Sequence, residues 1–281
     1  MSERFLIVRL GSLGDVIHGI PAAAALRRRY PGARIDWLVE PRYVAALRLV
    51  RGLDRVIDVD TRGGAVHLAR LARRLRAERY AAVVDLQGLL KSAVLARAAG
   101  APRTIGFPGE HLREPLARVF YTETPDPGAA AHVIDKNLAL VGVLGVADRR
   151  VEFPLEVPCT EAADAAESRL GRGYVLINPG AAWPNKRWPP DRFGAVAAAL
   201  REGVGLRSLV LWGPGEEALA AAVVGASRGA AEMAPPTGIT DLFDVARRAR
   251  VIVSGDTGPL HVAGAVGTPV VGLFGPTSAA R

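Results

Sequence analysis

The chain has 281 residues, which predicts two domains at ~150 residues per domain. Its 49% hydrophobic and 23% charged residues exclude a disordered chain, and the single cysteine, Cys159, excludes a disulfide framework and a thiolate metal cluster. Lys and Arg number 36 against 28 Asp and Glu, a net charge of +8, and only Lys91, Lys136 and Lys186 are lysines. This arginine excess is typical of an Ala- and Arg-rich genome, or of a surface for polyanions such as nucleic acid, an anionic membrane or phosphorylated substrates.

The first ten residues predict a strand and not a signal peptide, because they lack a long apolar region and a small-residue cleavage site. Between Thr257 and Ala280 no charged residue occurs, a length sufficient for a membrane helix. Three prolines and five glycines interrupt this stretch, so it predicts a helix over 259–266 and a buried strand over 268–274. We therefore expect a cytoplasmic protein without a membrane span.

The first half of the chain alternates apolar runs with amphipathic segments. The apolar runs predict strands over 5–10, 34–40, 55–60 and 80–86. The amphipathic segments predict helices near 15–29, 42–50, 65–78, 89–99 and 129–144. Strands that alternate with helices of this length favour a parallel sheet with helices on both faces.

The same pattern restarts after a proline-punctuated segment at 152–160. Further strands are predicted over 174–180, 207–213, 231–235, 251–256 and 270–274. Further helices are predicted over 190–201, 216–225, 240–249 and 259–266. We therefore expect two doubly wound α/β domains, 1–157 and 173–281, joined by a linker and helix over 158–172. Open α/β sheets bind ligands beyond the carboxyl ends of their strands, so we expect the two domains to face a central cleft there.

The first strand runs into a turn and a helix with the sequence LGSLGDVIHGIP (10–21). Gly11 and Gly14 allow a tight turn and close approach of the backbone to a ligand. Asp15 then lies in the first helical turn, where it is either a helix cap or a catalytic carboxylate. The pattern is neither a P-loop nor a GxGxxG dinucleotide fingerprint. His18, one turn later, is expected to be a packed or surface histidine.

The second half places candidate ligand-binding residues after its own strands. Lys186 is a rare lysine in a loop over 178–193, and a compact ammonium suits a phosphate oxygen; the alternative is a solvated lysine beside Arg187. Glu217, after the tryptophan–glycine turn at 212–213, is either a ribose ligand or a solvated first-turn acid.

The segment that most strongly indicates a binding site is VSGDTGPLHVAGAVGTPVVGLFGPT (253–277). It delivers Asp256, Thr257 and Gly258 from a strand onto the start of a new helix, where free N–H groups and the helix dipole favour an anion. His261 adds a further donor. Asp256 either accepts hydrogen bonds from sugar hydroxyls or caps the helix.

In the first half, DLQGLLKS (85–92) and REPLA (113–117) follow apparent strand ends. Lys91, Arg113 and His132 are candidates for an anionic acceptor, the alternative being charges on a helix surface. No HExxH, CxxC or DxD-like pair stands at a strand end, so no metal is expected. Aromatic residues make up only 6% of the chain and do not interleave with the arginines, so no nucleic-acid partner is expected.

Five segments together resemble glycosyltransferase family 9: GSLGDVIHGIP, DLQGLLKS, REPLARVFY, the loop KRWP at 186–189 and SGDTGPLHVAGAVGTPVVGLFGPT. The resemblance covers essentially the whole chain, and the first and last segments are specific as a pair. The second and third favour the type I over the type II lipopolysaccharide heptosyltransferases within this family.

The resemblance implies a GT-B fold and an inverting transfer that needs neither metal nor cofactor. It implies ADP-L-glycero-β-D-manno-heptose as donor and the Kdo sugar of the lipid A inner core as acceptor, at the cytoplasmic face of the inner membrane. The residues that match the family's donor site are Lys186, Glu217, Asp256, Thr257, Gly258 and His261. The family's catalytic base matches Asp15.

Two features depart from the family pattern. Ala181 and Ala182 stand where hydroxyl residues are expected before the lysine loop, so phosphate contacts there must come from elsewhere. The family also continues beyond GPT with a C-terminal helix, so we expect the second domain to be incomplete at its end. Alternative functions are heptosyltransferase II or another family 9 transferase, a nucleotide-sugar-binding module without transfer and, as a poor third, a dehydrogenase.

Overall fold

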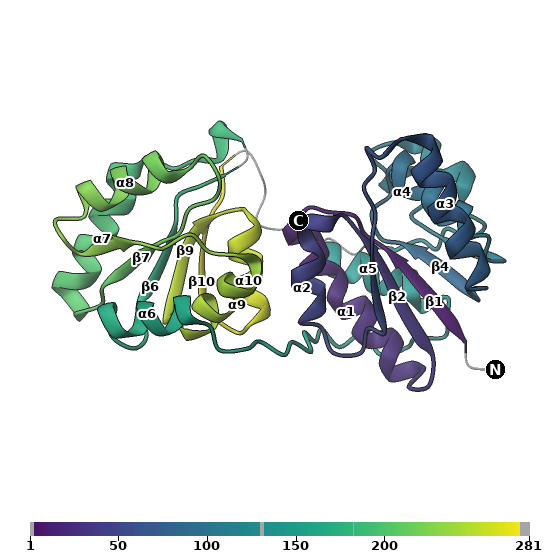
Figure 1. Ribbon diagram of the computed structural model, residues 1–281, viewed down its shortest axis with the longest axis horizontal. Helices are drawn as coiled ribbons and strands as arrows, with labels where there is room; N and C mark the ends of the chain where they lie inside the picture. Colours follow the sequence, from purple (N-terminus) through teal and green to yellow (C-terminus); the bar gives the residue numbers. More distant parts are fainter. Residues whose placement is uncertain (1–2, 130–131, 182, 276–281) are drawn as a thin grey trace. The chain divides into compact units, whose positions relative to one another are not determined.

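A computed structural model describes residues 3–129, 132–181 and 183–275. The chain divides into two compact units, Met1–Glu156 and Val157–Arg281, each built on one five-stranded parallel sheet. Figure 1 shows the sheet and the helices of each unit. The segment 158–172, expected as a linker and helix, contains helix α6 (Glu161–Leu170) of the second unit.

The sheet of the first unit has the strand order β3-β2-β1-β4-β5. Its strands are β1 (Arg4–Val8), β2 (Arg34–Val39), β3 (Arg55–Asp58), β4 (Ala82–Asp85) and β5 (Arg103–Ile105). Its α-helices are α1 (Leu13–Arg29), α2 (Val44–Arg48), α3 (Gly64–Ala77), α4 (Leu90–Ala98) and α5 (Val133–Gly142). Short 3-10 segments lie at Pro41–Tyr43, Gly109–His111 and Pro115–Phe120, the last of which is η3. The alternation of strand and helix predicted from the sequence is confirmed; β5 was not predicted.

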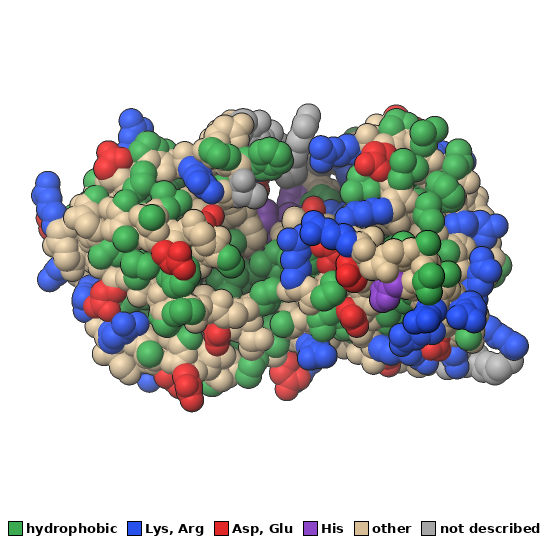
Figure 2. Space-filling model, turned by 45° about the horizontal axis from the view of Figure 1, so that its top comes forward, with side chains coloured by type: hydrophobic (Ala, Val, Ile, Leu, Met, Phe, Trp, Pro, Cys, Tyr) green, Lys and Arg blue, Asp and Glu red, His purple; other side chains and the backbone are tan. Residues whose placement is uncertain are grey.

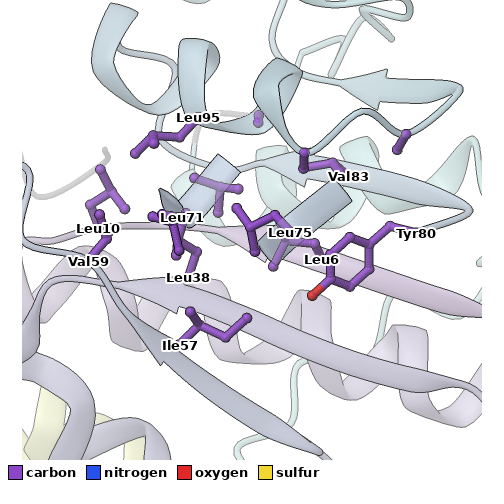
Figure 3. Close-up of a cluster of buried hydrophobic side chains, with 14 residues drawn as sticks. Leu6, Leu10, Leu38, Ile57, Val59, Leu71, Leu75, Tyr80, Val83 and Leu95 are labelled. Carbon is purple, nitrogen blue, oxygen red and sulfur yellow. The ribbon is translucent and has the colours of Figure 1, made fainter. Parts of the chain in front are cut away.

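Burial on both faces explains why these strands form a parallel sheet. Leu6, Ile7 and Val8 of β1 are fully buried, so the strand is apolar without alternation, as expected for a strand covered by helices on both sides. On one face the core joins strand residues to Leu71 and Leu75 of α3 and to Leu95 of α4 (Figure 3). The other face is covered by helices that include α1 and α5, which pack against each other.

The sheet of the second unit has the strand order β10-β9-β6-β7-β8. Its strands are β6 (Val175–Asn178), β7 (Ser208–Val210), β8 (Ala231–Met233), β9 (Val251–Gly255) and β10 (Val270–Leu273). Its further helices are α7 (Pro190–Val204), α8 (Glu217–Ala226), α9 (Ile239–Arg248) and α10 (Gly258–Ala265). The helix and strand predicted in place of a membrane span are thus α10 and β10. No helix among the described residues is long and apolar enough to cross a bilayer.

A buried carboxylate joins two helices of the second unit. Asp244 on α9 accepts hydrogen bonds from Arg248 Nη2 at 2.9 Å, from Arg247 Nη2 at 2.6 Å and from the Thr160 N–H, before α6, at 2.7 Å. Burial alone raises the pKa of Asp244, but these donors and the two positive charges outweigh burial and leave the pKa below its ordinary value. Asp244 therefore anchors the start of α6 to α9.

The strand orders locate the ligand-binding edge of each unit. In the first unit the chain leaves β1 and β4, which are neighbours, in opposite directions across the sheet, and in the second unit β6 and β9 have the same relation. Such switch points leave a crevice beyond the carboxyl ends of the two strands, where open α/β sheets bind ligands. The loops after β1, β4, β6 and β9 are therefore the expected places for ligand-binding residues.

Candidate functional site

Asp15 lies just beyond β1, at the switch point of the first unit and in the first turn of α1. The Ser12 N–H and Oγ each donate to Asp15 Oδ2 at 3.1 Å, an arrangement typical of a capping box. The Asp15 side chain is nevertheless 40% exposed. The carboxylate thus caps the helix and still meets solvent, and both uses expected from the sequence are compatible with its position.

A buried arginine, Arg9, faces the same carboxylate. Its Nη2 lies 2.5 Å from Asp15 Oδ1, and its Nη1 donates to the Leu86 carbonyl after β4. The Arg9 side chain is only 9% exposed, and its carbonyl accepts a hydrogen bond from the Trp37 indole at 3.1 Å. Arg9 is not among the residues predicted from the sequence, where it is one arginine of many in an apolar strand segment. An arginine at the end of a buried strand, a few residues before an acid, is the signal that would have identified it.

The glycines of this turn keep the backbone close to its neighbours. A Cβ on Gly11 would lie 2.6 Å from Cε2 of Tyr43, closer than real side chains approach. Gly14 is buried in the first turn of α1. Gly11 therefore allows the tight passage from β1 into α1 that brings Asp15 to the end of the sheet.

The loop after β4 is held by a second buried acid, Asp85. Its carboxylate accepts hydrogen bonds from the N–H groups of Gln87 and Gly88 and from the hydroxyls of Ser92 and Tyr121. Complete burial raises the pKa of Asp85. Gln87 Oε1 in turn accepts a hydrogen bond from the Leu10 N–H at 2.7 Å. The segment DLQGLLKS thus fixes the two loops of the switch point to each other.

The three basic residues predicted to bind an acceptor have different surroundings. Lys91 Nζ lies 3.1 Å from Glu40 Oε1; burial alone raises the pKa of Glu40, but Lys91 and Arg42 outweigh it and keep that pKa low. Arg113 is exposed, and within the described residues no hydrogen bond or ion pair engages it. His132 caps α5 by accepting from the Ile134 N–H at 3.2 Å.

His132 also contacts His18, which was expected from the sequence to be a packed or surface histidine. Its ring stands edge-on to His18, with 5.4 Å between ring centroids. The His18 carbonyl accepts a hydrogen bond from the buried Asn137 of α5 at 3.0 Å. Asp15 and His18 are three positions apart on α1 and therefore share one face of that helix. His132 thus contacts the helix that carries Asp15, whereas Lys91 lies on α4 and reaches Glu40 after β2, and Arg113 precedes η3.

In the second unit the switch point brings together three of the predicted donor residues. Lys186 Nζ lies 2.9 Å from Asp256 Oδ2, and His261 Nε2 lies 3.3 Å from Asp256 Oδ1. Lys186 follows β6 and Asp256 follows β9, so this pair spans the two loops of the crevice. Their side chains are only about one quarter exposed, at 23% and 22%. A lysine, an acid and an imidazole therefore stand side by side at the expected edge of the sheet.

A buried amide organises the same two loops. Asn178, the last residue of β6, donates through Nδ2 to Thr257 Oγ1 at 2.9 Å, to Ser254 Oγ at 3.0 Å and to the Gly180 carbonyl at 3.3 Å. Neither Asn178 nor Ser254 was predicted as a site residue, although each is a polar residue at the end of an otherwise apolar strand. Thr257, which was predicted, is thereby fixed as the N-cap of α10.

The start of α10 offers fewer free donors than the sequence suggested. Gly258 is its first residue, but Pro259 has no N–H and the Leu260 N–H already donates to the Thr257 carbonyl at 3.1 Å. The helix start alone therefore supplies little to an anion. More of the positive charge must come from the side chain of Lys186.

Two neighbouring acids at the start of α8, the N-cap Glu216 and the first residue Glu217, have different surroundings. Glu216 Oε2 accepts a hydrogen bond from the Gly213 N–H at 3.0 Å and packs against Gly180, where a Cβ would collide with it. Glu217, the predicted ribose ligand, is exposed, and no partner engages it within the described part of the chain. The structure thus adds Glu216, which the sequence analysis missed, to the loops after β6 and β7.

Two further expectations for this edge of the sheet concern the alanines that stand in place of hydroxyl residues and the lack of a metal site. Ala181 is buried, while Ala182 and the final GPT residues Pro276 and Thr277 lie outside the described residues. The Ala181 carbonyl accepts a hydrogen bond from Arg187 Nε at 3.0 Å. Among the described residues, no three His, Cys, Asp or Glu side chains cluster as metal ligands.

Comparison with known proteins places this arrangement in a family. The sequence pattern of glycosyltransferase family 9 (heptosyltransferase) matches residues 68–281. Lipopolysaccharide heptosyltransferase 1 of Pseudomonas aeruginosa is 30% identical over 98% of this chain and 79% of its own length.

Two solved structures are similar over almost the whole chain. E. coli heptosyltransferase WaaC with ADP-2-deoxy-2-fluoro heptose has a TM-score of 0.81 and 28% identity, covering 98% of this chain and 90% of WaaC. The family 9 glycosyltransferase of Veillonella parvula has a TM-score of 0.85 and 26% identity, covering 99% of this chain and 82% of its own. The two Rossmann-like units are thus those of a GT-B fold, and the chain is a glycosyltransferase that belongs to family 9, the heptosyltransferase family.

Proposed function

We propose that the protein transfers L-glycero-D-manno-heptose from ADP-heptose to the Kdo sugar of the lipid A inner core, in lipopolysaccharide core biosynthesis. The observation that carries this proposal is the contact of Lys186, Asp256 and His261 across the switch point of the second unit. A cation beside hydrogen-bonding groups in such a crevice suits a nucleoside diphosphate sugar. The similarity to a heptosyltransferase solved with an ADP-heptose analogue supports this choice of donor.

In the proposed reaction Asp15 is the general base. Its carboxylate takes the proton of the acceptor hydroxyl while that oxygen forms a bond to the anomeric carbon of the heptose. The bond from the same carbon to the diphosphate oxygen breaks, ADP leaves with that electron pair, and the anomeric configuration inverts. The Lys186 ammonium balances the charge that grows on the leaving diphosphate, which is the part a metal ion plays in other transferases.

The other donor residues hold the nucleotide sugar around this centre. Thr257 and Gly258 bring backbone close to the diphosphate, and His261 donates to a phosphate or sugar oxygen. Because Glu216 is already engaged by Gly213, the exposed Glu217 is the acid we assign to the ribose hydroxyls. No resident metal or cofactor enters this scheme.

On the acceptor side we assign Lys91, Arg113 and His132 to the acidic groups of the Kdo–lipid A acceptor. Exposed Arg113 can meet an anion directly. Lys91 must exchange its contact with Glu40 for one with the acceptor, which costs little because the pair is partly exposed. An acceptor of this kind places the enzyme in the cytoplasm, peripheral at the inner face of the inner membrane.

The test is Asp15→Asn, assayed by transfer of heptose from ADP-heptose to a Kdo-bearing lipid A acceptor. The loss of a positioned base lowers turnover about 10²–10⁴-fold, with donor affinity unchanged. Asp241→Asn is the matched control, because Asp241 holds the same capping position on α9 and accepts from the Gly238 N–H at 2.9 Å. Near-normal turnover of Asp15→Asn, or equal losses in both variants, would remove Asp15 from the chemistry.

A survey of donors and acceptors separates this function from its neighbours. Transfer from another nucleotide sugar, or to an acceptor that already carries heptose, would indicate another family 9 specificity, such as heptosyltransferase II. Donor binding without turnover on any acceptor would indicate a binding module. Only transfer from ADP-heptose to a heptose-free Kdo acceptor meets the proposal.

A further inference from the structure

Helix α4 and the 3-10 segment η3 of the first unit carry apolar side chains that the fold leaves uncovered. Val94 on α4 is 46% exposed, and Leu116 and Val119 on η3 are 69% and 72% exposed. Packing between α4 and η3, and a hydrogen bond from the Leu90 N–H to Glu114 Oε2 at 2.7 Å, make them one surface. The α4–η3 surface comprises Leu90, Val94, Leu116, Val119 and Phe120.

Positive charge surrounds this surface. From Gly64 to Phe120 the sequence has ten Lys and Arg against four Asp and Glu, a net +6 of the +8 of the whole chain. The four acids add little negative charge here: Asp85 is buried, Glu78 is paired with arginines, Glu114 is bound to Leu90 and only Glu110 is exposed. The same elements carry exposed arginines: Arg73 and Arg76 on α3, Arg97 on α4, Arg118 on η3 and Arg113 just before η3.

The two kinds of side chain meet in an open hollow. It is lined by Val94 and Phe120 together with Arg76 and Arg97. Arg76 is held there by a hydrogen bond from Nε to the Ala98 carbonyl at 2.9 Å. In Figure 2 hydrophobic and basic side chains share the surface of the first unit where α3 and α4 come forward. Apolar side chains beside arginine guanidinium groups are suited to an interface between lipid tails and anionic headgroups.

We propose that the α4–η3 surface docks the first unit onto an anionic lipid bilayer, with its apolar side chains among the acyl chains and its arginines on headgroup phosphates. Charge complementarity selects this occupant, because an uncharged partner would leave several arginines without counter-charge. The inference rests on the proposed lipid-linked acceptor for its use: docking brings the first unit to the surface in which that acceptor is embedded.

Binding to vesicles tests the surface without any sugar substrate. The full chain is incubated with vesicles of phosphatidylcholine mixed with phosphatidylglycerol, and with vesicles of phosphatidylcholine alone, and the bound fraction is measured by sedimentation. The wild-type chain binds the anionic vesicles more strongly, and binding weakens as salt is added. Failure of the wild-type chain to bind anionic vesicles overturns the proposal.

Two double variants locate the contact. Arg73→Gln with Arg97→Gln lowers the partition coefficient about 25-fold, from about fivefold for each arginine. Leu116→Ser with Val119→Ser lowers it about tenfold through lost apolar contact. The matched controls lie in the second unit: Arg172→Gln removes an exposed arginine and Val204→Ser an exposed valine, and both retain wild-type binding. Equal losses in controls and test variants overturn the assignment of this surface.

Two further measurements keep the outcome distinct from that of the proposed function. Transfer to a lipid-free Kdo saccharide remains unchanged in the test variants, because only docking is altered. If vesicle binding fails while this transfer proceeds, the docking surface is wrong and the proposed function stands; the reverse result rejects the function alone. Light scattering identifies a second copy as the occupant if the serine substitutions convert a dimer into a monomer, and this result also overturns the proposal.

Discussion

Replacement of Lys186 by alanine tests whether the cation of the second unit binds the donor diphosphate. Its ammonium lies 2.9 Å from Asp256 Oδ2, and both side chains are about one quarter exposed. A hydrogen bond from a charged group contributes about 1.5–3 kcal/mol. At tenfold per 1.4 kcal/mol, its loss weakens ADP binding about 10–150-fold.

The ion pair between Lys186 and Asp256 places the expected loss of ADP affinity towards the lower end of this range. In the free protein Lys186 is already held by Asp256, so part of what it gains from a phosphate replaces what it gives up to the carboxylate. We therefore expect Lys186→Ala to raise the Kd for ADP about 10–30-fold. Lys186→Arg weakens ADP binding less than alanine does, because it retains the charge. It still weakens binding, because a planar guanidinium fits the space of a compact ammonium poorly.

Isothermal titration with ADP measures this effect, and Lys91→Ala is the matched control. Lys91 is also a lysine paired with a carboxylate, at 3.1 Å from Glu40, but it lies in the first unit. Its removal leaves the Kd for ADP unchanged. Partly exposed pairs of this kind contribute at most about 1 kcal/mol to stability, so the free energy of unfolding of both variants stays close to that of the wild-type chain. A Kd for ADP within about twofold of wild type in Lys186→Ala would refute the assignment of Lys186 to the diphosphate.

Three further predictions concern the network that supports the two crevices. Asp244→Asn costs about 1.5–3 kcal/mol at neutral pH, because Arg247 loses its carboxylate partner and Arg248, which keeps Asp164 and Glu167, loses one of three. Since folding lowers the pKa of Asp244, its stabilisation is complete above the unfolded pKa of about 4 and is lost as the pH falls, so denaturant curves of wild type and variant converge in acid. Tyr121→Phe removes one of the four donors to buried Asp85 and costs about 1–2 kcal/mol, measured by urea unfolding; no loss would show that the hydroxyl is dispensable. Gly11→Ala costs about 1–3 kcal/mol because its Cβ would meet Tyr43 at 2.6 Å, and its transfer rate falls with the displaced turn; an unchanged melting temperature and rate would show that the ring yields freely.

Hydrophobic patterning was sufficient to predict most of the fold. The strands are short apolar runs and the helices that follow are amphipathic, so element type and order could be assigned without tertiary information. β5 (Arg103–Ile105) was missed because three residues with a polar centre carry almost no pattern, and only pairing with β4 makes Thr104 part of a sheet. Neighbouring strands, rather than its own sequence, define such an edge strand.

The site was predictable where a residue follows a strand and was missed where its function depends on a partner. Lys186, Asp256 and Thr257 each come after a strand end, so strand assignment alone brought them into one region. Arg9 and Asn178 lie within the predicted strands 5–10 and 174–180 and are buried, and their importance appears only from the atoms they contact. A single sequence does not reveal which residues contact each other between neighbouring strands and loops.

Asp15 can be both a helix cap and the proposed catalytic base. Asp15 Oδ2 accepts from the Ser12 N–H and hydroxyl, and Oδ1 faces Arg9, so both oxygens have fixed neighbours. A carboxylate has about four acceptor positions, so these contacts leave room for the hydroxyl of a substrate. A general base is effective only when its oxygen is held at hydrogen-bonding distance from the proton it removes. Capping supplies that restraint, because it fixes the rotamer of a side chain that remains 40% exposed. The cap is therefore a means of positioning the proposed base rather than a competing explanation for the aspartate.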